Sequence, residues 1–325
     1  MRARLWVFVS LAMALAAIAA VPARGDRQGR IAGRVTDTSG RPLRGICASA
    51  VTRDDVAFPV NTDAKGKYAI SVPSGTYKVY FAGCAQSPNY SPQWYPDRPS
   101  KSTGRSLHVG AGESVTGIDA RMQVGGEITG RVLTRSGRPP GPFFTVFADA
   151  KGLNDAFPMM GAFTYAAASD GSYTIVGLAS GSYLVEFPPG GAGPAYPVSW
   201  YPQQPDPGHG HWVNVTAGQT TGIGLEILER PGAIFGHVRG RDSHPVAGAV
   251  VSAKIREPDG SVYIGASSRV ASDGSYRLGG LAAGEWTATV RVELPHPVTA
   301  RHSVLVEPGA TTRLDFTIPP RRRRP

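Results

Sequence analysis

Short runs of alternating apolar and polar residues recur along this chain, and turn residues separate them. Alternation with a period of two predicts β-strands that bury one face. Three of these runs share the form Ile-x-Gly-x-Val and lie at 31–35, 128–132 and 234–238. Because the segments that follow each run are also similar, the chain is predicted to consist of three structural repeats.

A second pattern supports the repeats. An Asp-Gly turn followed by Tyr is found as Asp170-Gly171-Ser172-Tyr173 and Asp273-Gly274-Ser275-Tyr276, and in longer form at 63–68. Each copy is followed by a Gly-x-aromatic step that ends at Tyr77, Tyr183 or Trp286. Asp-Gly supplies the positive φ values of a tight reversal, so we expect a β-hairpin in each repeat. The three aromatic residues at the strand starts are predicted to fill the cores.

With 41 Gly and 28 Pro, the composition suits short strands joined by many turns, and no segment shows a convincing helical pattern. About seven strands per repeat predict an all-β chain of three tandem Greek-key β-sandwich (prealbumin-like) domains after a signal peptide. We expect these domains at 29–124, 125–229 and 230–320, followed by a basic tail at 321–325. The very short connections between them predict a semi-rigid rod.

The Gly-x-Val first strand, the Asp-Gly-Ser-Tyr turn and the Gly-x-Tyr strand resemble the bacterial carboxypeptidase regulatory-like domains. These belong with transthyretin-like and collagen-adhesin B-type modules and neighbour starch-binding-like sandwiches. The resemblance covers about residues 29–320. It implies the fold but not the function, because such domains are fused to peptidases, adhesins, transporters and glycosidases.

The N-terminus predicts export. Arg2 and Arg4 precede an apolar stretch at 5–20, and Ala17-Ile18-Ala19 and Ala23 are candidate cleavage positions. We therefore expect a signal peptide over 1–23 and a secreted, periplasmic or cell-surface protein. The alternative is an uncleaved membrane anchor, since the apolar run approaches the length that spans a bilayer. No second apolar run exists, so no stable membrane span is expected after cleavage.

The net charge of +10 falls to +8 without Arg2 and Arg4, and to +4 when Arg321 to Arg324 are also set aside. This balance predicts a mildly basic surface, or attraction of the tail to anionic surface polymers. Nucleic-acid binding is not expected, because the basic residues are scattered and the protein is exported.

Cys47 and Cys84 are the only cysteines, and an oxidising compartment favours a disulfide between them. In the loop-entropy description such a bridge contributes about 4 kcal/mol. The alternative is a pair of buried thiols. Neither cysteine recurs in the later repeats, so the bridge is specific to the first domain.

No catalytic residues, metal ligands or cofactors are predicted. None of the histidines has the Glu three positions on that a zinc carboxypeptidase needs, and His209 and His211 lack a third ligand. The Asp residues of the Asp-Gly turns stand without the oxygen partners that calcium requires. We therefore expect a non-enzyme.

The candidate binding residues lie in a motif shared by the first two repeats only. Each copy reads Tyr-x-x-x-Trp-Tyr-Pro inside a long connection, which suits a functional loop. The residues are Tyr90, Trp94, Tyr95, Tyr196, Trp200 and Tyr201. Their rings could stack on a sugar or on a proline-rich ligand. Alternatively, the two tryptophans cover an open sandwich edge.

The sequence therefore predicts an exported, monomeric, non-enzymatic binding or scaffold protein, with a glycan or cell-wall polymer as partner. The alternative is an accessory or catalytic component of a secreted hydrolase that degrades polysaccharide or peptide.

Overall fold

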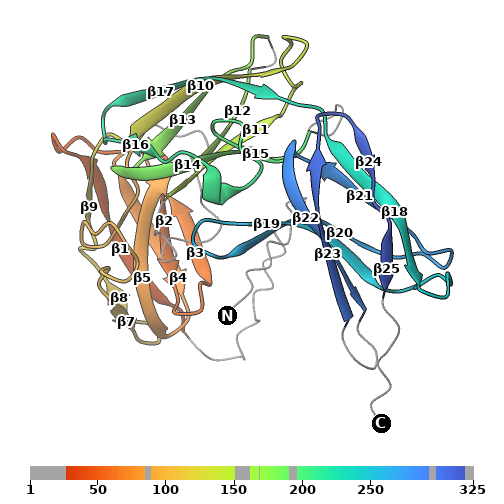
Figure 1. Ribbon diagram of the computed structural model, residues 1–325. Coiled ribbons are helices and arrows are strands. Elements are labelled where there is room, and N and C mark those ends of the chain that lie inside the picture. The colour runs from red at the N-terminus through yellow and green to blue at the C-terminus, as the bar shows by residue number, and fades with distance from the viewer. Residues whose placement is uncertain are drawn as a thin grey trace.

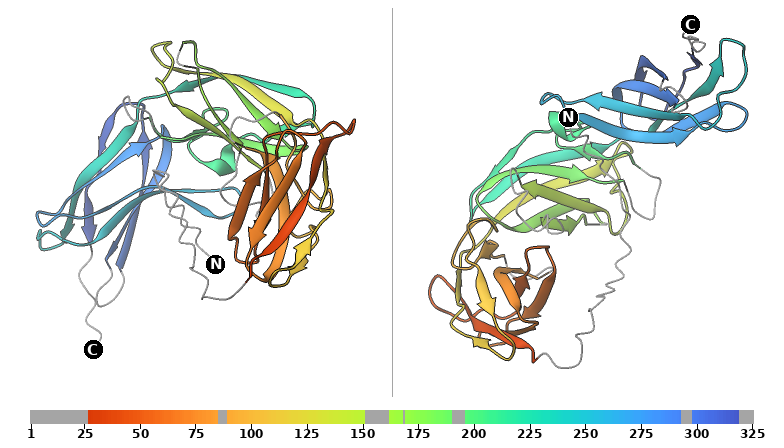
Figure 2. Two further views of the ribbon diagram at one scale, coloured as in Figure 1. Left: turned by 180° about the vertical axis from the view of Figure 1, so that it is seen from behind. Right: turned by 90° about the horizontal axis from the view of Figure 1, so that it is seen from below.

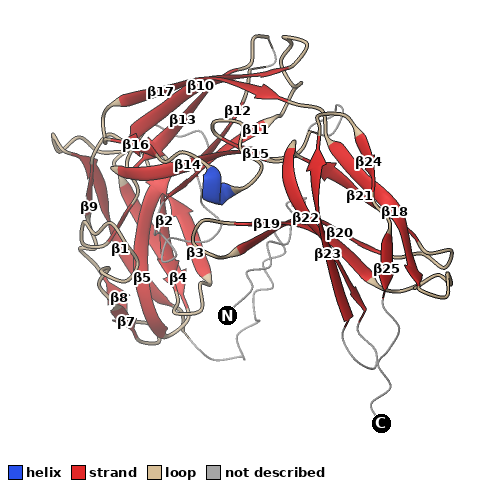
Figure 3. Cartoon of the chain, viewed as in Figure 1, coloured by secondary structure: helices blue, strands red, loops and turns tan. Residues whose placement is uncertain are grey.

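The computed structural model describes residues 27–84, 89–150, 162–167, 169–189, 196–292 and 298–318. The predicted signal peptide and the basic tail lie outside these residues. The described chain is almost entirely β-structure, with one short 3-10 turn (Figure 3). It forms six sheets that pair into three sandwiches, named here modules 1, 2 and 3 after the predicted boundaries. In Figure 1 the modules follow one another along an arch.

Module 1 has one sheet of order β4-β1-β8, with β9 also on β1, and one of order β3-β2-β5-β6, with β7 also on β5. The strands are β1 (Gly29–Asp37), β2 (Ile46–Val51), β3 (Ala57–Asn61), β4 (Lys67–Val72), β5 (Gly75–Gly83), β6 (Gln93–Trp94), β7 (Leu107–Val109), β8 (Ser114–Val115) and β9 (Ala120–Met122).

Module 2 repeats this arrangement with sheets β13-β10-β17 and β12-β11-β14-β15, and β16 also pairs with β14. Its elements are β10 (Gly126–Thr134), β11 (Thr145–Ala150), β12 (Ala162–Tyr165), β13 (Ser172–Leu178), β14 (Gly181–Phe187), β15 (Ser199–Trp200), the 3-10 turn η1 (Pro207–His209), β16 (Val213–Val215) and β17 (Thr220–Leu228).

Module 3 has sheets β21-β18-β24, with β25 also on β18, and β20-β19-β22-β23. Its strands are β18 (Gly232–Gly240), β19 (Val250–Arg256), β20 (Val262–Arg269), β21 (Ser275–Leu281), β22 (Gly284–Val292), β23 (Val298–Val306), β24 (Thr311–Arg313) and β25 (Phe316–Ile318). The all-β sandwich fold predicted from the repeats is confirmed, and the boundaries between the modules stay a prediction.

The first strand of each module pairs in parallel with the closing strands, whereas its other partner is antiparallel. Because the first and last strands run in the same direction, the chain enters a module at one end and leaves at the other. The next module can then begin at once, and Figure 2 shows the three sandwiches following one another in a curved row.

The Asp-Gly turns differ from the hairpins that the sequence predicts. Strands β3 and β4, which flank the first turn, belong to opposite sheets, and so do β12 and β13, and β20 and β21. The turns therefore carry the chain across the sandwich. The turn chemistry itself is as predicted: Gly66, Gly171 and Gly274 have positive φ. Alternation cannot distinguish these two arrangements, because a strand buries one face in either case.

The aromatic residues after the second turn are core residues, as predicted. Tyr77, Tyr183 and Trp286 are buried, and each donates a hydrogen bond to the carbonyl oxygen four residues earlier, at 2.8, 2.9 and 2.9 Å. The ring fills the space between the sheets while its polar atom is satisfied at the turn. The same contact therefore anchors the second sheet in all three modules.

A disulfide joins Cys47 to Cys84, and no other cysteine exists in the chain. The bridge connects β2 to the segment that follows β5, at the start of the long connection of module 1. This confirms the pairing predicted from the sequence.

Replacing both Cys47 and Cys84 with Ser should lower the free energy of unfolding of module 1 by about 2–4 kcal/mol, because the unfolded chain regains its loop entropy. Urea unfolding can be followed through Trp94, which is the only tryptophan within 29–124. A reductant should destabilise the wild type equally and leave the double variant unchanged. An unaltered unfolding midpoint in the variant would contradict this role of the bridge.

Candidate functional site

The two Tyr-x-x-x-Trp-Tyr-Pro loops share one backbone conformation. Trp94 exchanges two backbone hydrogen bonds with Arg98, both at 2.7 Å, and Trp200 exchanges two with Gln204, at 2.9 and 2.7 Å. Tyr95 donates its backbone N–H to Val79 on β5, Tyr201 donates to Val185 on β14, and each tyrosine precedes a cis proline. The shared sequence therefore encodes one compact turn beside β5 and beside β14.

The tryptophans lie on the outer faces of their sheets. Each forms part of a two-residue strand, β6 or β15, at the end of the β5 or β14 sheet. Trp94 is 1% exposed and packs against Tyr80 with a ring-centroid separation of 4.9 Å. Trp200 is 5% exposed and meets Tyr263 of module 3 edge-on at 5.4 Å.

The tyrosines of the loops turn the other way. Tyr90 and Tyr95 pack against the core between the two sheets of module 1. Tyr196 lies within the core of module 2, and Tyr201 packs against it. Each loop therefore closes its sandwich from two sides, with tyrosines inside and a tryptophan outside.

This geometry bears on the predicted ligand site. Trp94, Trp200 and Tyr196 are buried and offer no exposed ring face, while Tyr90, Tyr95 and Tyr201 are half-buried. The rings do not form a flat platform for a sugar. The arrangement agrees with the alternative, in which the loops cover the sandwich edge. Sequence alone could not decide this, because burial depends on what the rest of the loop contacts.

The loop of module 2 is held by a buried carboxyl group that the sequence did not reveal. Glu226 on β17 is 1% exposed, and its oxygens accept the backbone N–H of Gln203 at 3.0 and 3.2 Å. Burial raises the pKa of Glu226 to about 8. The hydroxyl of Tyr173, whose pKa burial and this carboxyl both raise, has no hydrogen-bond partner among the described residues.

Glu226 faces the core because of a register shift. The pairing of β10 with β17 slips by one residue between Thr129 and Arg131, where Gly224 adopts a φ of 80°. Strict alternation from Ile223 would turn Leu225 inward, yet Leu225 is 48% exposed. A one-residue slip exchanges the faces of a strand, so alternation counted from Ile223 predicts the wrong faces for Leu225 and Glu226.

Two joints connect the modules. At the first, Asn89 of module 1 donates its side-chain amide to Glu127 at 2.8 Å, and its side-chain oxygen accepts the N–H of Gly177 at 2.7 Å. The backbone N–H of Gly125 also donates to the carbonyl of Asn89 at 3.0 Å. A Cβ on Gly125 would lie 2.8 Å from the Cα of Gly177, so the close approach requires glycine here.

At the second joint, Leu184, Val198 and Trp200 of module 2 are part of the hydrophobic core cluster of module 3. The neighbouring carboxyl of Glu186 is half-buried, and this partial burial together with the charge of Asp149 raises its pKa to about 7. The hydroxyl of Tyr263 is buried there without a described hydrogen-bond partner. The joint is therefore a shared apolar core with a carboxyl group at its margin.

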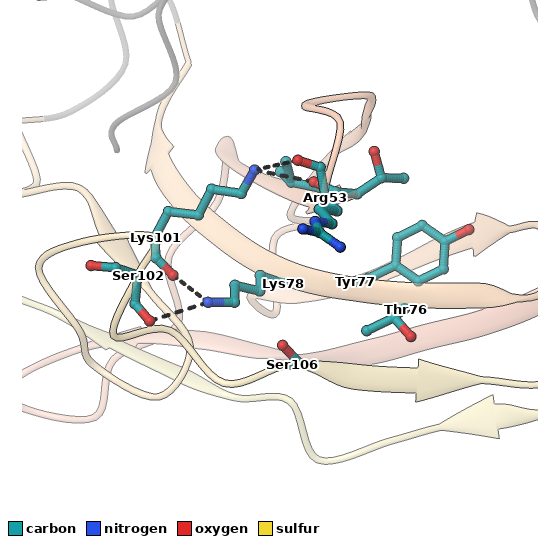
Figure 4. Close-up of a pocket in the computed structure, with 9 residues that line it drawn as sticks. Arg53, Thr76, Tyr77, Lys78, Lys101, Ser102 and Ser106 are labelled. Atoms are coloured by element: carbon teal, nitrogen blue, oxygen red, sulfur yellow. Dashed lines mark hydrogen bonds between the residues drawn. The ribbon is translucent and has the colours of Figure 1, made fainter. Parts of the chain in front are cut away.

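A surface pocket of about 370 Å³ lies on module 1 (Figure 4). The ammonium of Lys78 donates to the carbonyls of Lys101 and Ser102 at 2.6 and 3.3 Å, and Lys101 pairs with Asp55. Arg53 is exposed at the rim. The further lining residues are mostly hydroxyl-bearing: Thr52, Thr76, Tyr77, Ser102 and Ser106, together with Val51. Arg53 therefore places an exposed positive charge at the rim of the pocket, whereas the ammonium groups of Lys78 and Lys101 are already bonded within the chain. An exposed guanidinium suits an anionic, hydrogen-bonding group.

The other polar residues considered in the sequence analysis make only local contacts. His209 pairs with Asp206 at 2.9 Å, and His211 lies against the ring of Tyr201. The described residues hold no group of three or more potential metal ligands. The carboxylates of the Asp-Gly turns, such as Asp63, accept backbone N–H groups at 2.8 Å, which lowers the pKa of Asp63. No helix within the described ranges has the length and hydropathy to cross a membrane.

A model of the carboxypeptidase regulatory-like domain family matches residues 30–123 and 233–319. These segments are modules 1 and 3. Module 2 has the same strand order, with the register shift described above. No curated protein matches the chain.

Several solved structures resemble the chain at low sequence identity. A streptococcal ancillary pilin is 14% identical over 91% of this chain and 100% of its own, with a TM-score of 0.30. GBS52, the minor pilin of Streptococcus agalactiae, is 14% identical over 61% and 98%, with a TM-score of 0.33. The Bacillus anthracis TIE protein is 12% identical over 90% of this chain, which spans 51% of that protein, with a TM-score of 0.26.

The buried carboxyl of Glu226 should make module 2 less stable as the pH rises. Its native pKa of about 8 lies above the ordinary 4.5, so the native state binds the extra proton and stability falls between these two values. Glu226→Gln should remove this loss and stabilise the protein at pH 8 relative to pH 5, by ~4 kcal/mol at most. Thermal unfolding at both pH values measures the difference.

The matched control is Glu285→Gln on β22, where the side chain is exposed. It should leave the pH dependence of unfolding unchanged. If Glu226→Gln destabilises the protein equally at pH 5 and pH 8, Glu226 is charged in the native state and the assignment is wrong.

Proposed function

The chain belongs to the carboxypeptidase regulatory-like domain family, and we propose that it is an exported, non-enzymatic scaffold that holds its modules in a fixed order for binding at the cell surface. The observation that carries the proposal is the construction of the two joints. A flexible tether would leave the facing surfaces of the modules solvated. Here Asn89 bonds across the first joint, and the core of module 3 extends onto module 2 at the second.

Two features support a location outside the cytoplasm. The N-terminal pattern of Arg2, Arg4 and the apolar stretch at 5–20 is typical of a signal peptide. The disulfide between Cys47 and Cys84 is of a kind that persists in oxidising compartments.

The placement of the perturbed carboxyl groups supports a role without catalysis. Raised carboxyl pKa values often mark catalytic acids. Glu226, however, holds the loop of module 2 through the N–H of Gln203, and Glu186 lies beside the second joint. The structural positions of these groups account for both pKa shifts.

We propose in addition that the pocket of module 1 contacts an acidic group of a surface polymer or glycan. Arg53 supplies an exposed positive charge, and Thr76 and Ser106 supply exposed hydroxyls. The positive net charge of the chain would favour the same class of partner. This site replaces the aromatic loops as the candidate for polymer binding.

Asn89→Ala should loosen the first joint without unfolding either module, because it removes two side-chain hydrogen bonds between modules. Small-angle X-ray scattering should then show a broader range of module arrangements than in the wild type. Asn214→Ala is the control, since Asn214 bonds to Ser182 within module 2. An unchanged scattering profile for Asn89→Ala would argue against a joint held by this residue.

Arg53→Glu should weaken binding to a soluble acidic polysaccharide such as polygalacturonate several-fold, because it places a negative charge at the pocket rim. Affinity electrophoresis at low and high salt measures the effect, and salt should weaken wild-type binding. Arg277→Glu on β21 of module 3 applies the same change of charge away from the pocket. An equal loss for both variants would indicate non-specific attraction to the net charge.

A further inference from the structure

Among the described residues, only module 2 carries an exposed band of aromatic rings. The band consists of Phe143, Phe147, Phe163 and Tyr165. Phe143 meets Tyr165 at 6.1 Å between ring centroids, Tyr165 meets Phe163 at 6.0 Å, and Phe163 meets Phe147 at 5.7 Å. Phe143 is 75% exposed, Phe163 43% and Tyr165 45%. Phe143 also has a φ of 64°, which is unusual for a bulky residue.

The band lies along an open sheet edge. Strand β12 is the last strand of the order β12-β11-β14-β15, and among the described strands it pairs only with β11. Ala166 donates its backbone N–H to the carbonyl of Phe144, so these two residues form a hydrogen-bonded pair. Hydrogen-bonded and non-hydrogen-bonded pairs alternate along β11 and β12 from there. By antiparallel geometry, the backbone groups of Phe163 and Tyr165 then point away from β11. No other strand in the described part of the chain pairs with these groups.

The equivalent edges of the other modules are protected. Equivalent positions on the three edge strands follow from the strand register. Ser49, Phe147 and Ser252 occupy the same position in their modules, and each pairs with the edge strand (β3, β12 or β20) on one side and with β5, β14 or β22 on the other. Phe163 corresponds to Pro59 in module 1 and to Ser267 in module 3, and Tyr165 corresponds to Asn61 and Arg269. Proline and charge are common devices against edge-to-edge pairing. Module 2 has neither at these positions.

The ring geometry favours a protein partner over a sugar. The ring planes of Phe143 and Tyr165 lie at 88° to each other, and those of Phe163 and Tyr165 lie at 83°. Perpendicular rings form no flat platform for a pyranose, but they interlock with other side chains. The band is also continuous with an existing interface, since the row across the sheet runs from Phe163 through Phe147 and Glu186 to Trp200, where module 3 docks.

We propose that β12 is a self-association edge, at which two copies of the chain pair antiparallel about a two-fold axis. With Thr164 opposite its own counterpart, Phe163 faces Tyr165 of the second copy on both sides of the axis. This register uses the outward backbone groups of both residues and makes four hydrogen bonds. It also repeats across the interface the Phe163–Tyr165 ring contact found within one chain. The two five-stranded sheets become one continuous sheet.

The interface is small. Four edge residues and the rings beside them bury less than the roughly 1,600 Å² of a standard interface. We therefore expect a weak dimer, with a dissociation constant on the order of 10–100 µM. Such an affinity matters where copies are concentrated on a surface, and it would add pairing to the fixed module order of the scaffold.

The test is sedimentation equilibrium of the purified chain over a concentration series that spans the micromolar range. Wild type should shift from monomer to dimer. Phe163→Pro and Tyr165→Arg place the protective residue types of modules 1 and 3 on this edge, and each should weaken association at least tenfold. Phe235→Arg is the control, because Phe235 is a partly exposed aromatic residue on the central strand β18. Circular dichroism checks that every variant is folded.

The register is tested separately with Thr164→Cys, because residues opposite each other in a non-hydrogen-bonded pair approach to about 4.5 Å, within disulfide range. Mild oxidation should give a covalent dimer, and adding Phe163→Pro should prevent it. A wild type that stays monomeric throughout the series would overturn the proposal. A dimer that persists in both edge variants, or that Phe235→Arg disrupts equally, would overturn it as well.

Discussion

Each module depends on one contact at the place where the chain enters its second sheet. Tyr77, Tyr183 and Trp286 lie between the sheets, and each donates to the carbonyl four residues earlier. The contact ties the turn to the core, because the ring cannot reach its place unless the turn is formed. It also satisfies the polar atom of a buried aromatic residue. The remaining strands are arranged around this point.

The parallel pairing of first and closing strands explains why the modules join directly. A chain that enters and leaves at opposite ends brings each module into contact with the next. The joints are built differently, since Asn89 bonds to Glu127 and Gly177 at one, and an apolar core extends across the other. Their shared consequence is that surfaces of neighbouring modules are held at defined positions, which is what a scaffold requires.

Differences between equivalent positions carry the specific properties of the chain. The core position of Ala120 in module 1 is Glu226 in module 2 and Phe316 in module 3. The edge position of Pro59 is Phe163 in module 2. Module 2 therefore has an ionisable residue where module 1 has an apolar one, and an aromatic residue where module 1 has a proline. A buried titratable group and an open aromatic edge follow from these two departures.

The sequence by itself determined the all-β fold, the three repeats, the core aromatics and the partners of the disulfide, because alternation, turn residues and cysteine count are local or countable properties. It did not determine which strands share a sheet, since the same alternation suits a hairpin and a crossing such as β3 to β4. Only the tertiary structure buried Trp94 against Tyr80 and Trp200 against module 3, and turned Glu226 inward. Burial depends on contacts between distant segments and on a one-residue register shift, and neither is written in the local pattern.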